Sequence, residues 1–139
     1  MKTREVVNTR WIDNMAFETE VNGHKLIIDA DHEVGEENLG PRPKPFMLAA
    51  LGRCTAMDVI SILKKMRVEV KSLNVRVEGE LTEEQPRRFY KMHVTYEIEG
   101  DELPMDKVKK AVSLSEDRYC GVSAVYKDAL ELTSEIIVV

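Results

Sequence analysis

The sequence predicts a single α+β domain in which helices pack on one face of an antiparallel sheet. One observation is that strand-type patterns at both ends of the chain enclose a long apolar helical stretch. The other is that a second, shorter helical pattern precedes the last strand. The element order is therefore β-β-β-α-β-β-α-(α)-β, and a length of 139 residues fits one domain spanning 1–139.

The first thirty residues predict a three-stranded antiparallel meander. Residues 3–12 are rich in β-formers, and residues 15–21 alternate in the manner of a half-buried strand. The pair Asn22-Gly23 is a strong hairpin signal, because both positions tolerate a positive φ. Residues 24–30 then form the return strand. The face of the second strand expected to point inward comprises Met15, Phe17, Thr19 and Val21.

A long helix follows a loop over 31–43 that contains no periodic pattern. The helix is expected to begin near Pro45, where proline is tolerated, and to end near Arg67. A core stripe at helical spacing comprises Leu48, Leu51, Thr55, Val59, Ile62 and Met66. A second stripe comprises Met47, Ala50, Cys54, Met57 and Ser61. A helix with two such faces needs two partners, namely its own sheet and either another helix or another subunit.

The second half of the chain returns to strands. The patterns predict strands over 68–81, 88–99 and 132–139, a helix from Pro104, a break at 119–121 and a helical piece over 122–130. On the strand over 88–99, the alternation places Tyr90, Met92, Val94, Tyr96 and Ile98 on one face.

Composition excludes several classes of function. A net charge of −5 without a basic cluster argues against a nucleic-acid partner. The N-terminus has no apolar segment of the kind found in signal peptides. The apolar stretch over 46–63 is interrupted by Arg53 and Asp58, which favours a buried helix over a membrane span. Two cysteines cannot build a disulfide framework, so we expect a cytoplasmic protein with reduced thiols.

Cys54, in the middle of the long helix, is open to two interpretations. It is either a small buried apolar residue or a reactive thiol. A reactive thiol needs a nearby cation, and the sequence offers Arg53 beside it and Arg42 in the preceding loop. Asp58, four residues later on nearly the same face, could hold an arginine or satisfy a buried neighbour. Its carboxylate would raise the pKa of the thiol unless a cation intervenes.

Cys120, at the break before Gly121, is either an incidental loop thiol or the partner of Cys54. In the second case the two form a peroxidatic and resolving pair, which requires Cα atoms within about 7 Å. A Cys/His metal site that uses His32 lacks the usual ligand spacing, so we expect no metal and no cofactor.

The two cysteine contexts resemble one family. Residues 40–67, GPRPKPFMLAALGRCTAMDVISILKKMR, are similar to the central helix of the OsmC/Ohr family of osmotically induced and organic hydroperoxide resistance proteins. Residues 115–123, SEDRYCGVS, resemble the segment with the second cysteine of that family, and Trp11 also fits. The resemblance covers essentially the whole chain.

The resemblance implies an intertwined homodimer in which antiparallel sheets wrap the central helices of both subunits. It further implies sites at the dimer interface, with Cys54 peroxidatic and Cys120 resolving. The implied substrates are small organic hydroperoxides and the implied reductant is a dithiol. Peroxidase members carry a glutamate in the first turn of the helix, where this chain has Lys44 and Pro45.

Two functions therefore remain open at the level of sequence. The first is a cysteine-dependent peroxidase for organic hydroperoxides. The second, favoured by the absence of that glutamate, is a non-catalytic dimer that binds a small apolar ligand or senses redox state. A purely structural role for both cysteines is the third interpretation.

Overall fold

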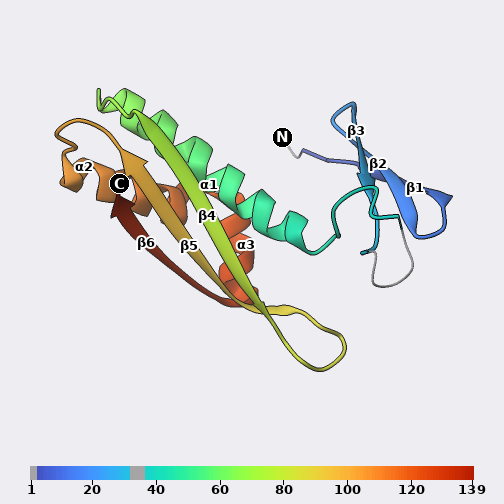
Figure 1. The fold of residues 1–139 in the computed structure, drawn as a ribbon. Coiled ribbons are helices and arrows are strands. Elements are labelled where there is room, and N and C mark those ends of the chain that lie inside the picture. The colour runs from blue at the N-terminus through green and yellow to red at the C-terminus, as the bar shows by residue number, and fades with distance from the viewer. Residues whose placement is uncertain (1–2, 32–36) are drawn as a thin grey trace. The chain divides into compact units, whose positions relative to one another are not determined.

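The protein has a mixed α+β fold with two small sheets and three α-helices (Figure 1). The structure, a computed structural model, describes residues 3–31 and 37–139. The chain forms two compact units, Met1–Met47 and Leu48–Val139. The elements are β1 (Asn8–Asp13), β2 (Ala16–Val21), β3 (His24–Ile28), α1 (Pro45–Lys65), β4 (Ser72–Leu81), β5 (Phe89–Glu99), α2 (Met105–Leu114), the π-helical turn η2 (Ser115–Tyr119), α3 (Gly121–Ala129) and β6 (Glu131–Val138).

The first unit contains the predicted antiparallel meander, with strand order β1-β2-β3. The turn between β2 and β3 is formed by Asn22 and Gly23, whose φ values are 50° and 81°. Val21 and His24 are therefore opposite each other, as expected for a two-residue hairpin. Part of the predicted loop, including His32, lies outside the described residues.

Two details of the meander differ from the prediction. The first strand begins at Asn8 and not at residue 3. The predicted inward face of β2 is also wrong in part, because Ala16 and Thr19 are buried whereas Phe17 is exposed. The register between β1 and β2 is also irregular, because Trp11 pairs with Phe17 but Asp13 pairs with Ala16, which leaves Ile12 as an extra residue of β1. Such an irregularity interrupts the two-residue alternation of a strand.

The second unit is built on the sheet β4-β5-β6. The alternation predicted for β4 is confirmed, with half-buried and exposed residues in strict succession. On β5 the buried face contains Met92, Val94, Tyr96 and Ile98, as predicted. Tyr90 is exposed and Phe89 is buried instead, because a register shift opposite Glu80 and Leu81 leaves Tyr90 as an extra residue.

The prediction of purely antiparallel sheets is wrong for the last strand. β6 pairs with β5 in parallel, with Lys91 opposite Glu131 and Ile98 opposite Val138. The physical reason is the connection between the two strands. α2, η2 and α3 form a long helical crossover, which returns the chain to the starting end of β5.

α1 packs its core stripe against the buried face of this sheet (Figure 1). Leu51, Thr55 and Val59 are buried, which confirms the predicted stripe. Gly52 lets the helix lie close to β4, because a Cβ at this position would be 3.2 Å from the Cγ2 atom of Val77.

The second stripe of α1 is largely exposed, and 53% of Met57 is accessible. By length and composition alone α1 could cross a membrane, with a mean hydropathy of 1.6 over an 18-residue window that is 28% buried. The core helix of a soluble protein satisfies the same criterion.

The C-terminus of α1 is closed by a Schellman motif around Arg67. The amide of Val68 donates to the carbonyl of Leu63 at 2.9 Å, and the amide of Arg67 donates to that of Lys64 at 3.0 Å. Arg67 has a φ of 60°, in the left-handed region that strains a residue with a Cβ.

Arg67→Gly is expected to raise the free energy of unfolding by about 0.5–1 kcal/mol, because glycine adopts this conformation without strain. Chemical denaturation monitored by circular dichroism measures the change. As a control, Lys65→Gly inside the last turn should lower stability by about 1 kcal/mol. A loss of stability in Arg67→Gly would contradict the interpretation of this cap.

Candidate functional site

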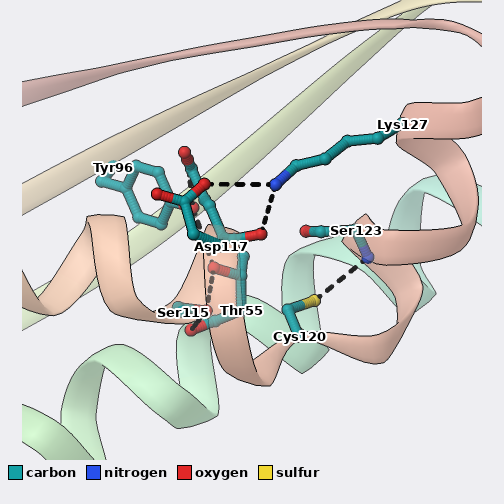
Figure 2. A network of polar contacts seen from close by, with 8 residues as sticks. Thr55, Tyr96, Ser115, Asp117, Cys120, Ser123 and Lys127 are labelled. Carbon is teal, nitrogen blue, oxygen red and sulfur yellow. Dashed lines mark hydrogen bonds and ion pairs between the residues drawn. The ribbon is translucent and has the colours of Figure 1, made fainter.

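Cys120 occupies the break between η2 and α3, as the sequence predicted. Its backbone is extended, with φ −77° and ψ 102°, and its amide donates to the carbonyl of Ser115 at 2.7 Å. Cys120 is also the N-cap of α3, because its sulfur accepts the amide hydrogen of Ser123 at 3.4 Å (Figure 2). The residue is only 3% exposed.

Cys54 lies beside Cys120. The side chains of the two cysteines share a hydrogen bond, and both are free thiols. The backbone amide of Val122 is a second hydrogen-bond partner of Cys54. The Ser123 amide thus donates to the Cys120 sulfur, and the neighbouring Val122 amide acts on Cys54 by lowering the pKa of its thiol. The helix N-terminus is the end that favours negative charge.

The surroundings of Cys54 nevertheless favour the neutral thiol. Burial, the largest effect, raises the pKa of Cys54, and the hydrogen bond and charge of Cys120 and the charge of Asp58 raise it further. The Val122 amide alone acts in the opposite direction and lowers this pKa. The balance means that a thiolate at this position needs a group that removes its proton or neutralises the nearby charge.

Neither arginine that the sequence offered as an activating cation for Cys54 acts on that thiol. Arg53 is exposed and borders a hollow lined by Leu48, Val75 and Val77. Arg42 belongs to the first unit, where it donates a hydrogen bond to the side chain of Asn38. Within the described part of the chain, no arginine is among the groups that shift the pKa of Cys54.

Asp58 satisfies a buried neighbour, the structural alternative that the sequence left open. Its Oδ2 atom accepts a hydrogen bond from the Ser115 hydroxyl at 2.9 Å. Ser115 is fully buried and in turn contacts the hydroxyl of Thr55 at 2.8 Å. The Thr55 hydroxyl also contacts that of Tyr96 at 2.8 Å, and Tyr96 donates to Glu116 at 3.0 Å. Figure 2 shows how Thr55, Ser115 and Tyr96 converge from α1, η2 and β5.

Two hollows lie at the two ends of this hydroxyl chain. One, of about 560 Å³, is lined by Asp58, Ser61, Ile62, Lys65, Met66, Leu114 and Tyr119. The other, of about 230 Å³, is lined by Glu116, Asp117, Arg118, Tyr119, Cys120, Gly121, Ala124 and Lys127. Lys127 links α3 to η2, since its Nζ atom donates to the Glu116 carbonyl at 2.5 Å and lies 3.3 Å from Asp117.

The sequence patterns indicated the two cysteines and Asp58 but not the hydroxyl chain that begins at Asp58. Ser115, Tyr96 and Glu116 carry no motif of their own. One feature of the sequence did indicate a buried polar contact, because Thr55 is a polar residue on the core stripe of α1. A buried hydroxyl requires hydrogen-bond partners, which other elements must supply.

Asp58→Asn is expected to lower the pKa of Cys54, because it removes a negative charge that opposes the thiolate. At a pH below the pKa of Cys54, the thiolate fraction of Cys54 and its rate of alkylation by iodoacetamide should be about two- to threefold higher in the variant than in its parent. The measurement is the pH dependence of alkylation in a Cys120→Ser background, so that only Cys54 reacts.

Asp128→Asn, on the exposed surface of α3, is the matched control and should leave the alkylation profile unchanged. Identical profiles for Asp58→Asn and its parent would show that the carboxylate has no electrostatic effect on the thiol.

No three His, Cys, Asp or Glu side chains among residues 3–31 and 37–139 are grouped so that they could share a metal ion. His93 instead bridges Thr133 and Glu135 on β6, at 2.7 Å and 2.8 Å.

The fold and the adjoining thiols define a small α+β protein with a two-cysteine site. A family model described as OsmC-like protein matches residues 35–135. The chain therefore belongs to the OsmC-like family, as the sequence resemblance indicated. Protein YhfA of Escherichia coli K12 is 33% identical over 131 residues, which cover 94% of this chain and 95% of that protein.

Solved structures show the same fold. A hypothetical protein from Aquifex aeolicus VF5 superposes with a TM-score of 0.83 at 24% identity and 99% coverage of both chains. An OsmC-like protein of unknown function from Vibrio cholerae gives 0.78 at 19% identity, covering 98% of this chain and 100% of that one. The organic hydroperoxide resistance protein OhrB of Bacillus subtilis gives 0.66 at 15% identity, with 96% and 98% covered.

Proposed function

We propose that this protein is a cysteine-dependent peroxidase that reduces small organic hydroperoxides. Cys54 is the peroxidatic and Cys120 the resolving residue. The observation that carries the proposal is the pairing of the two free thiols at the start of α3. Membership of a family with relatives named organic hydroperoxide resistance proteins supports the choice of substrate.

The reaction proceeds in three steps. The Cys54 thiolate attacks the terminal oxygen of the hydroperoxide, so that an S–O bond forms and the O–O bond breaks. Cys54 becomes a sulfenic acid, and the leaving alkoxide takes up a proton to give an alcohol. The Cys120 thiol then displaces water from the sulfenic acid and forms a disulfide. A dithiol reductant finally transfers two electrons and two protons and restores both thiols.

Mass spectrometry of the reduced protein after one equivalent of cumene hydroperoxide tests this proposal. We expect a loss of two hydrogens per chain and a tryptic peptide pair joined by Cys54 and Cys120. The product alcohol should appear in the same amount. Unmodified thiols after a long incubation with excess hydroperoxide would overturn the proposal.

A second candidate function is the binding of a small apolar ligand without catalysis. Two observations favour it: the raised pKa of Cys54 and the hollow of about 560 Å³ that Ile62, Met66 and Leu114 help to line. Titration with a fluorescent fatty acid separates the two functions. Saturable binding together with inert thiols would favour the ligand-binding protein.

The proposed active form is a homodimer in which a second copy covers the second stripe of α1. This surface contains Ala50, Met57 and Ser61, which are exposed, and the half-buried Cys54. An apolar helix face of this kind is typical of a subunit interface.

Met57→Glu is expected to shift the protein from dimer to monomer, because the new carboxylate would be desolvated in the interface. Analytical ultracentrifugation over a concentration series measures the shift. Asp128→Lys on the exposed side of α3 serves as the control and should remain dimeric. A monomeric wild type, or a fully dimeric Met57→Glu, would contradict the proposed interface.

A further inference from the structure

Five side chains form a continuous chain of oxygen–oxygen contacts through the core of the second unit. The order is Asp58, Ser115, Thr55, Tyr96 and Glu116, with successive distances of 2.9, 2.8, 2.8 and 3.0 Å. The three hydroxyl residues in the middle are at most 1% exposed. The two carboxylates at the ends are half-buried, and each borders one of the two hollows.

The five side chains have fewer protons than hydrogen bonds when both carboxylates are ionised. Each of the four contacts requires one proton, because two oxygens at 2.8–3.0 Å attract each other only through a hydrogen. Ser115, Thr55 and Tyr96 each supply one hydroxyl proton, and an ionised carboxylate supplies none. With both carboxylates ionised, three protons serve four contacts. Donation from Ser115 to the Thr55 carbonyl, at 3.5 Å, would only increase the deficit.

We propose that these five residues form a proton relay. The relay takes up one proton, which Asp58 and Glu116 share, and supplies it to the reaction at Cys54. The added proton completes all four hydrogen bonds. Because every hydroxyl can both donate and accept, reversing the direction of the bonds moves the acidic proton from one carboxylate to the other. The relay thereby connects the two hollows through an otherwise apolar core.

Several charged groups surround the two ends. Lys65 and Tyr119 share the hollow of Asp58, and Cys54 lies one helical turn before it. Around Glu116, the described groups are Tyr96 from β5, Lys127 from α3 and the neighbouring Asp117 and Arg118. The cations Lys65 and Lys127 thus lie one at each end, and the charge at Asp58 acts directly on Cys54.

The catalytic role of the relay rests on the proposed function. The presence of the shared proton is independent of that function, because it follows from the four oxygen–oxygen contacts. In the reduced protein the relay already holds its shared proton, so that Asp58 carries less negative charge beside the Cys54 sulfur, which favours the thiolate. When the O–O bond breaks, the relay gives this proton to the leaving alkoxide. The proton that Cys54 releases on forming its thiolate replaces it in the relay, so that no proton is gained or lost overall.

Thr55→Val tests the relay, because it replaces the central hydroxyl by a methyl group of similar size. Two contacts then remain, Ser115 to Asp58 and Tyr96 to Glu116, and two hydroxyl protons satisfy both. The variant should therefore no longer take up the extra proton. Tyr96→Phe has the same effect, because only the contacts of Ser115 with Asp58 and with Thr55 remain, and the two hydroxyl protons satisfy both. Thr95→Val, a buried threonine on the opposite face of β5, is the matched control.

Infrared spectroscopy of the reduced protein at neutral pH detects the C=O stretch of a protonated carboxyl group. Ordinary Asp and Glu side chains, with pKa values of about 4, are ionised under these conditions. We expect a band of about one carboxyl per chain in the wild type and in Thr95→Val, and its loss in Thr55→Val and Tyr96→Phe. Unfolding midpoints verify that each variant is folded.

Absence of the band in the wild type, or an unchanged band in both relay variants, would overturn the proposal. The band needs no substrate, so its presence in a chain that does not reduce hydroperoxide contradicts the proposed function alone. In an active protein, Thr55→Val should also slow the first turnover by about a hundredfold, a typical contribution of positioned proton transfer.

Discussion

Cys54→Ser is expected to lower the rate of organic hydroperoxide reduction by a factor on the order of a thousand or more, because a hydroxyl is a far weaker nucleophile than a thiolate. Stopped-flow measurement of cumene hydroperoxide consumption, with a dithiol in excess, gives the rate directly. Near-background rates for the wild type and for Cys54→Ser alike would end the peroxidase interpretation.

The matched control for this experiment is Cys120→Ser. Its first turnover should remain within about threefold of the wild type, since the attacking sulfur is unchanged. The intramolecular disulfide cannot form, so the sulfenic acid of Cys54 should accumulate and react with a dimedone probe. A first turnover that fails in Cys120→Ser would show that Cys120 acts before the resolving step.

Ile98→Ala is expected to lower the free energy of unfolding by about 2–5 kcal/mol, because it leaves a cavity in the core. Ile98 lies on the buried face of β5, is 0% exposed and belongs to the apolar cluster that packs against α1. Urea denaturation monitored by fluorescence and circular dichroism measures the loss.

Ile137→Ala is the control in the same sheet. Ile137 lies on the neighbouring strand β6, opposite Glu97, and is 41% exposed. The same truncation should change stability by less than about 1 kcal/mol at this site. Equal losses at the two positions would mean that the buried face of β5 is not the core of this unit.

Much of the fold could be predicted because it follows local patterns. The Asn22-Gly23 turn, the stripe containing Leu51 and Val59 and the alternation of β4 all depend on neighbouring residues, and all are confirmed. The errors arise where distant segments decide the outcome. The extra residue Tyr90 in β5 depends on the register with β4, and the parallel direction of β6 depends on the path of the crossover.

The candidate site also contains residues that could be predicted from the sequence and residues that could not. Cys54 and Cys120 were predicted as a pair from their contexts, and the structure places them close together. The hydroxyl chain could not be predicted, because its members come from three elements that meet only in the folded state. Ser115 in particular reaches Thr55 from the start of the π turn between α2 and Cys120.

The parallel pairing of β5 and β6 has a consequence for the variability of this protein. The segment from Phe89 to Val138 is a closed ring, since hydrogen bonds join its two end strands. Tyr96, Ser115 and Cys120 all belong to this ring, whereas Cys54, Thr55 and Asp58 belong to α1. The site is therefore assembled from two parts. An insertion in the helical crossover would move Cys120 relative to β5, whereas the turn between β4 and β5 lies outside both parts and accepts insertions more readily.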